Sequence, residues 1–235
     1  MIPRKPEESA FLKALIHSPA GHGKTHLLGT AQEDERTYPM AFLNFEAGES
    51  SLAGLDIDVF DIKTWADYNE VYAQLSAKGN GGYKSVGVDS ITETQVAGLL
   101  EILASDGKRA DPDQLAQQDW GIILVKMRRF VRHFVKMLPM HVLMTALSKD
   151  DTIARVGQVK VPAVQGGFAA ELPGIFDVVG YLALEDNPDG GPATRLLLLN
   201  GYPKFSCKAR TPWGSDTPNE IENPTVGKLL DTLHF

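Results

Sequence analysis

Short apolar segments alternate with amphipathic ones through the first two thirds of the chain. Five apolar segments are typical of buried β-strands, at residues 13–17, 40–45, 57–62, 83–88 and 141–146. Helices are predicted between these strands: a short one that begins at Lys24, and three more at residues 65–75, 91–103 and 120–138. Strands that alternate with helices in this way favour a parallel sheet with helices packed on its faces.

The last of these helices has the clearest pattern. Its apolar residues recur every three or four positions and therefore form one stripe, at Ile123, Met127, Phe130, Phe134 and Leu138. The helix over residues 65–75 is expected to follow a cap at Thr64 and to stop at the glycine-rich residues 78–82. The polar residues 106–113 predict a surface loop.

The pattern changes after residue 156. Four further strands are predicted, at residues 156–161, 178–184, 194–199 and 205–209, with a hairpin connection at 187–191 and a last helix at 224–233. We expect one α/β domain over residues 1–235, with a mainly parallel sheet flanked by helices and an antiparallel β extension. Its parts would be an N-terminal tail (1–11), a core (12–148), the β-rich extension (149–210) and a C-terminal tail with a helix (211–235).

Composition narrows the class of protein. The 235 residues are 43% hydrophobic, enough for one sizeable core. The formal net charge of −7 means that any contact with a nucleic acid needs a local basic patch. The one cysteine, Cys207, excludes an intramolecular disulfide and fits a reducing compartment. No apolar run suits a signal peptide or a membrane span, so we expect a cytoplasmic protein without membrane contact.

A glycine-rich segment follows the first predicted strand and leads into a helix. It consists of Ser18, Pro19, Ala20, Gly21, His22, Gly23, Lys24 and Thr25. Glycines let backbone N–H groups curl around phosphates, Lys24 would reach the β- and γ-phosphates, and the Thr25 hydroxyl would bind Mg²⁺. His26, next in the helix, would also contact the nucleotide. The usual pattern begins with glycine where this chain has Ser18, and the alternative is a chance glycine-rich turn. The segment predicts that the chain binds ATP with Mg²⁺.

Acidic and hydroxyl residues follow the other predicted strands. Asp89 ends the strand 83–88 and would hold Mg²⁺ through water, or simply cap the next helix. Glu46 follows the strand 40–45 and would activate water for hydrolysis, with Glu49 as the second candidate; both could instead be solvated loop acids. Thr145 and Ser148, at the end of the strand 141–146, could sense the γ-phosphate.

These motifs, S-P-A-G-H-G-K-T, F-L-N-F-E-A-G, V-G-V-D-S-I-T and H-V-L-M-T-A, together resemble a known family. The resemblance runs from about Leu12 to Arg210 and is to the phage-encoded RecA/RadA-like core ATPases, grouped with Sak-type single-strand annealing proteins. It implies a RecA-like P-loop fold, a phage- or prophage-encoded protein, and Glu46 as the residue that activates water. It also implies that Lys208 and Arg210 reach a nucleotide across a subunit interface, although a solvated strand end is the alternative.

The resemblance implies partners as well. Members assemble into rings or filaments and bind single-stranded DNA through mobile loops, which here would be residues 149–167. A single-strand binding protein is a further partner to expect. A second basic surface is the helix face with Arg128, Arg129, Arg132 and Lys136, which could equally be a solvated face.

The motifs and the resemblance leave three candidate functions. The first is an ATP-hydrolysing recombination protein that assembles on single-stranded DNA and promotes annealing or strand pairing. The second is a nucleotide-switched assembly module, such as a helicase loader or packaging factor, whose target is a protein. The third is a small-molecule phosphotransferase, which ranks last because no arginine-rich lid segment is evident.

Overall fold

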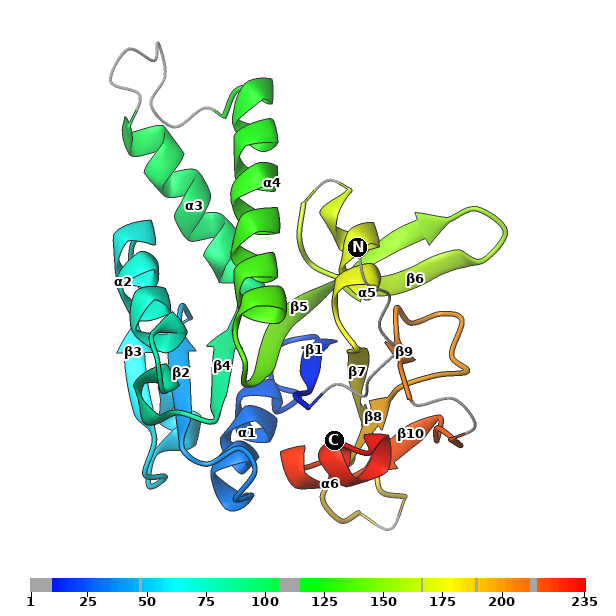
Figure 1. Ribbon diagram of the computed structural model, residues 1–235. Coiled ribbons are helices and arrows are strands. Elements are labelled where there is room, and N and C mark those ends of the chain that lie inside the picture. The colour runs from blue at the N-terminus through cyan, green and yellow to red at the C-terminus, as the bar shows by residue number, and fades with distance from the viewer. Residues whose placement is uncertain (1–9, 47, 106–114, 166, 189, 212–214) are drawn as a thin grey trace, which may run out of the picture.

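The computed structural model describes residues 10–46, 48–105, 115–165, 167–188, 190–211 and 215–235. Within these residues the chain forms a sheet of ten strands with helices on both faces (Figure 1). The strands are β1 (Lys13–Ser18), β2 (Met40–Asn44), β3 (Asp58–Asp61), β4 (Ser85–Asp89), β5 (His141–Ile153), β6 (Gly157–Pro162), β7 (Val178–Glu185), β8 (Thr194–Leu198), β9 (Lys208–Ala209) and β10 (Glu220–Glu222).

The order of the strands confirms a mainly parallel sheet with an antiparallel extension. Six neighbouring strands, in the order β7-β1-β5-β4-β2-β3, are parallel. Both β8 and β9 pair antiparallel with β7, and β10 pairs with β8. Since parallel strands all end at one edge, the segments after β1, β2, β4 and β5 meet there.

Alternating side chains of each strand divide the core into two layers. In β1, Leu15 packs with one layer while Ala14 and Ile16 pack with the other. Helices α2 (Trp65–Ser76), α3 (Ile91–Ser105), α4 (Gln117–Arg132) and α5 (Phe168–Ile175) cover the first face. Helices α1 (Lys24–Gly29) and α6 (Val226–Leu233) cover the second. The result is a three-layer α/β/α arrangement.

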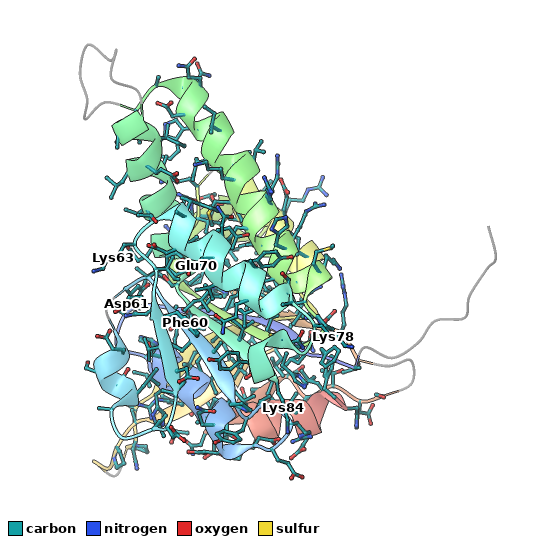
Figure 2. All side chains as sticks on the ribbon, turned by 60° about the vertical axis from the view of Figure 1, so that its left-hand side comes forward. Phe60, Asp61, Lys63, Glu70, Lys78 and Lys84 are labelled. Atoms are coloured by element: carbon teal, nitrogen blue, oxygen red, sulfur yellow. The ribbon has the colours of Figure 1, made fainter. Side chains whose placement is uncertain are left out.

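The predicted helix features are largely confirmed. The Thr64 side chain accepts a hydrogen bond from the Asp67 N–H as the cap of α2. Figure 2 views the molecule from the side of β3 and shows Phe60 and Asp61 on this edge strand beside α2. The whole apolar stripe of the predicted helix 120–138 is buried, but the helix begins at Gln117 and its end is a π-helical turn over residues 133–137. None of the helices within the described residues is long and apolar enough to cross a membrane.

Several predicted elements were wrong. Residues 149–167 are not one mobile loop, because β5 continues to Ile153 and pairs with β6 in a hairpin. Of the predicted strand 205–209 only the end, β9, is a strand, since the chain first crosses to β6 through a bridge from Lys160 to Phe205. Helix α5 and strand β10 were not predicted, and α6 begins after Thr225, its cap, rather than at residue 224. The predicted loop 106–113 lies outside the described residues.

Candidate active site

The glycine-rich segment forms a loop at the carboxyl end of β1, the strand at the centre of the sheet. Gly21 and Gly23 have φ angles of 79° and 92°, values that glycine adopts without strain. The buried Lys24 ammonium donates to the carbonyl oxygens of Ser18 at 3.2 Å and Pro19 at 3.0 Å, so its side chain lies across the loop. Burial lowers the pKa of Lys24, while the negative charges of Asp89 and Glu46 oppose this shift.

A hydroxyl–carboxylate cluster lies beside the loop. Thr25 Oγ1 donates to Asp89 Oδ2 across 2.5 Å, which joins the first turn of α1 to the end of β4. The buried Thr145 hydroxyl, from β5, donates to the other carboxylate oxygen of Asp89. Thr145 therefore holds Asp89 in place. Its expected role, to sense the γ-phosphate, stays a prediction. Ser148 lies further along β5 and bonds to His17 instead.

The two candidate bases have different surroundings. Glu46 is half-buried and accepts a hydrogen bond from the buried Ser90 hydroxyl, which directly follows Asp89. Burial raises the pKa of Glu46, and the charge of Asp89 acts in the same direction. Glu49 is exposed and accepts from Asn44 Nδ2 at 2.8 Å. The hydrogen bond from Ser90, the residue after Asp89, brings Glu46 beside the Thr25–Asp89 pair, whereas Glu49 bonds to Asn44 instead.

The residues present fit a nucleotide with Mg²⁺. A Cβ added at Gly21 would meet no atom within 4 Å, so the loop is open on this side. Thr25 and Asp89 bring a hydroxyl and a carboxylate oxygen together, and Mg²⁺ prefers such hard oxygen ligands. Lys24 supplies the positive charge that phosphates require.

Residues 10–211 match the protein family described as "AAA domain". The chain belongs to this family. An AAA domain is an ATPase module, so the match agrees with the phosphate loop and identifies the chain as a P-loop nucleoside triphosphatase. No curated protein matches the sequence significantly.

This AAA domain is also similar to solved structures. One is the flagellar accessory protein FlaH from Methanocaldococcus jannaschii, with 10% identity, a TM-score of 0.42, and 92% of this chain and 89% of that chain covered. A KaiC-like protein from Pyrococcus horikoshii gives 13% identity, a TM-score of 0.44 and 90% of each chain. An ATPase from the type III secretion system of pathogenic bacteria gives 16% identity, a TM-score of 0.46, 73% of this chain and 51% of that chain.

Two predicted site residues of the AAA domain lie at the other edge of the sheet. Lys208, in β9, pairs with Val179 of β7, which is level with Leu15 near the start of β1. Arg210 follows β9 and contacts Asp177, with 3.5 Å between Nη1 and Oδ1. The loop begins three residues beyond Leu15, about 10 Å further along the strand. Within this chain, Lys208 and Arg210 are therefore not brought together with the phosphate loop.

One residue beside the loop was not anticipated. Arg195, on β8, places its guanidinium against Gly23 and donates from Nε to the His22 carbonyl oxygen at 3.3 Å. His22 also donates from Nδ1 to the Leu182 carbonyl oxygen of β7 at 3.0 Å. No local signal marks Arg195, because its position depends on which strand lies next to β7. The exposed His26 lies on α1, outside these loop contacts.

Proposed function

We propose that this protein hydrolyses ATP with Mg²⁺ and assembles on single-stranded DNA to promote annealing or strand pairing. The observation that carries the ATPase part is the convergence of three groups at one edge of the sheet: the loop lysine Lys24, the Thr25–Asp89 pair and Glu46. Lys24 and Thr25 follow β1, Asp89 ends β4 and Glu46 follows β2, so the ends of three strands supply the parts that phosphoryl transfer to water requires.

Each of these residues takes a separate part in hydrolysis. Lys24 and the loop N–H groups bind and orient the phosphates. Thr25 and Asp89 would hold Mg²⁺, and this ion neutralises charge on the phosphate oxygens when it is bound. Glu46 accepts a proton from the attacking water, and its raised pKa makes it a better proton acceptor than an exposed glutamate. Ser90 holds the Glu46 carboxylate through the hydrogen bond described above.

The β5–β6 hairpin offers the better surface for single-stranded DNA. A groove of about 570 Å³ runs beside it and is lined in part by Lys160, Lys204 and Phe205. Lysines that follow a backbone and an aromatic ring on which a base can stack are the elements of single-strand recognition. Lys160 is paired with Asp150 at 2.8 Å, so DNA phosphate would have to compete with this carboxylate.

The basic face of α4 is the weaker surface. Arg128 donates to both carboxylate oxygens of Glu171 on α5, at 3.1 Å and 3.0 Å from Nε, and this charge is already compensated. The Arg132 charge lowers the pKa of the same Glu171 carboxylate in addition to Arg128. Arg128, one of the four cations of this basic face, is therefore already engaged with α5.

The test of DNA-dependent activity is an ATPase assay with and without added single-stranded DNA. We expect the DNA to raise turnover, and binding to weaken steeply as salt increases. A double change, Lys160→Gln with Lys204→Gln, should abolish the stimulation and leave the basal rate. Arg132→Gln on α4 is the matched control and should retain it. Stimulation that is lost in the control but kept in the double variant would contradict the hairpin assignment.

Assembly would bring Lys208 and Arg210 to a neighbour's nucleotide. Because they lie at the edge opposite the loop, a head-to-tail contact between subunits would join the two half-sites, as in a ring or filament. Positive charge supplied across that interface would offset charge on the γ-phosphate. Lys24→Ala and Arg210→Ala subunits should each be inactive alone. Mixed in equal amounts, they should recover activity at about a quarter of the interfaces; no recovery would contradict the shared site.

A second candidate function is an assembly module that acts on a protein. The observation in its favour is a set of exposed apolar side chains on α3 and α4, namely Val96, Leu100, Ile122 and Val125. Exposed apolar groups of this kind mark protein contact surfaces. ATP-dependent capture of a partner protein, together with an ATPase rate that does not respond to DNA, would select this function over the first.

A further inference from the structure

The ligand edge of the sheet carries a second cation besides Lys24. Arg195 lies in β8, where it pairs with Leu184 at the far end of β7. Leu184 lies three residues beyond Tyr181, which is the last β7 residue that pairs with β1. β8 thus extends past the parallel sheet on the side where the phosphate loop lies, and its residue Arg195 contacts the loop.

The guanidinium of Arg195 lies against the backbone of the loop. A Cβ added at Gly23 would lie 2.6 Å from Arg195 Nε and 3.3 Å from both Cζ and one terminal nitrogen. Arg195 Nε also donates to the His22 carbonyl oxygen at 3.3 Å. Gly23 needs glycine because of its φ of 92°, and a side chain added there would also displace the Arg195 guanidinium.

The strand also fixes the backbone of Arg195. The Asn223 N–H donates to the Arg195 carbonyl oxygen at 2.7 Å, just after β10. Within the described part of the chain, no carboxylate lies within ion-pair distance of the Arg195 guanidinium, although Arg36, Arg128 and Arg210 all have such a partner. A half-buried guanidinium that contacts a phosphate-binding loop and has no acidic partner has charge left for an anion.

We propose that Arg195 is a positioning residue for the nucleotide: it fixes the His22–Gly23 peptide of the phosphate loop and adds positive charge beside the phosphates. The reason is geometric. The His22 carbonyl belongs to the peptide whose N–H is that of Gly23, so a hydrogen bond on the carbonyl fixes the direction in which this N–H points. The ligand class is a nucleoside di- or triphosphate, so the assignment rests on the proposed ATP site.

The proposal is tested by nucleotide titration with Arg195→Gln and Arg195→Ala, using a fluorescent ATP analogue. We expect roughly tenfold or greater loss of affinity, the range for one charge-assisted hydrogen bond. The thermal midpoint without nucleotide should stay near that of the wild type, and KM should rise more than kcat falls. Free guanidinium at millimolar concentration should restore part of the affinity to Arg195→Ala. Arg132→Gln, an exposed arginine on α4, is the control and should bind normally and not respond to guanidinium.

Three outcomes distinguish a failure of the Arg195 assignment from a failure of the proposed ATP site. Wild-type affinity in Arg195→Gln would overturn the positioning role and leave the proposed ATP site intact. Reduced affinity that follows a lowered thermal midpoint, with no recovery by guanidinium, would also overturn it, because a purely structural role predicts that result. A wild-type protein that binds no nucleotide would overturn the proposed function and this assignment together.

Discussion

Two buried histidines should make the fold sensitive to mild acid. His17 in β1 and His141 in β5 are buried, and burial lowers the pKa of each from 6.5 to about 4. Both accept a hydrogen bond at Nδ1, from the Ser148 hydroxyl in one case and from the Leu12 N–H in the other. Protonation would put a donor where an acceptor is required, so the folded state resists it.

The size of the effect follows from the two pKa values. The pKa of each histidine is lower in the folded protein than in the unfolded chain. Stability is therefore full when the pH is above the unfolded-state pKa, and it falls as the pH drops from there towards the folded-state pKa. Between about pH 7.5 and about pH 5, each histidine should cost about 2 kcal/mol, and the pair about 4 kcal/mol. This is a large part of the total stability of an ordinary domain. Glu46 has the opposite effect: because burial raises its pKa, lowering the pH makes its contribution to stability more favourable.

Urea unfolding, followed by tryptophan fluorescence at both pH values, measures this loss. His141→Asn keeps an acceptor oxygen near the position of Nδ1 and does not titrate, so this variant should lose only about half as much as the wild type. His26→Asn, a change at an exposed histidine of α1, is the control and should lose as much as the wild type. Equal losses in the wild type and in His141→Asn would refute the argument.

Three further predictions concern the site itself. Glu46→Gln keeps an acceptor for Ser90, so nucleotide affinity should remain while turnover falls roughly 100-fold or more in a phosphate-release assay. An unchanged turnover rate would exclude Glu46 as the base. Because burial raises the pKa of Glu46, this variant should also have a higher melting temperature than the wild type above neutral pH, and this gain should disappear in acid. Thr145→Val leaves Asp89 without one of its two hydroxyl donors and should cost about 1–3 kcal/mol in urea unfolding, whereas a stability equal to wild type would show that the contact contributes nothing. Gly23→Ala must place a Cβ against Arg195 at a φ of 92° and should weaken nucleotide binding, with about 1–2 kcal/mol from the backbone alone; normal affinity would mean that the loop adapts.

Much of the fold and site could be predicted because it rests on short-range patterns. The apolar stripe from Ile123 to Leu138 specifies a buried helix face whatever packs against it. The contact between Thr25 and Asp89 follows from a general rule, that parallel strands end at one edge of the sheet. Arg195 could not be found in this way. Its place beside the loop depends on β8 pairing with β7, and β7 with β1, which local sequence does not encode.

Elements held by tertiary contacts were also missed. The second half of β5 reads Lys-Asp-Asp-Thr-Ile, too polar for a strand by itself, yet its backbone pairs with β6 through six residues, from Ser148 to Ile153. Helix α5 contains Pro173 and Gly174, which disfavour a helix in isolation. It forms because Phe168 and Leu172 are fully buried in the core, and packing of an apolar face outweighs intrinsic propensity.

The position of His17 connects the fold to the site. Its Nε2 faces the Ser206 carbonyl oxygen at 2.8 Å, and a carbonyl only accepts, so the proton lies on Nε2 and leaves Nδ1 free to accept from Ser148. His17 directly precedes the phosphate loop. Its neutral ring therefore links the loop to Ser148 at the base of the β5–β6 hairpin and to Ser206, which lies close in sequence to Lys204 in the groove. Burial lowers the pKa of His17 to about 4 and the nearby positive charge of Lys24 acts in the same direction, so at neutral pH the ring stays uncharged and keeps this link.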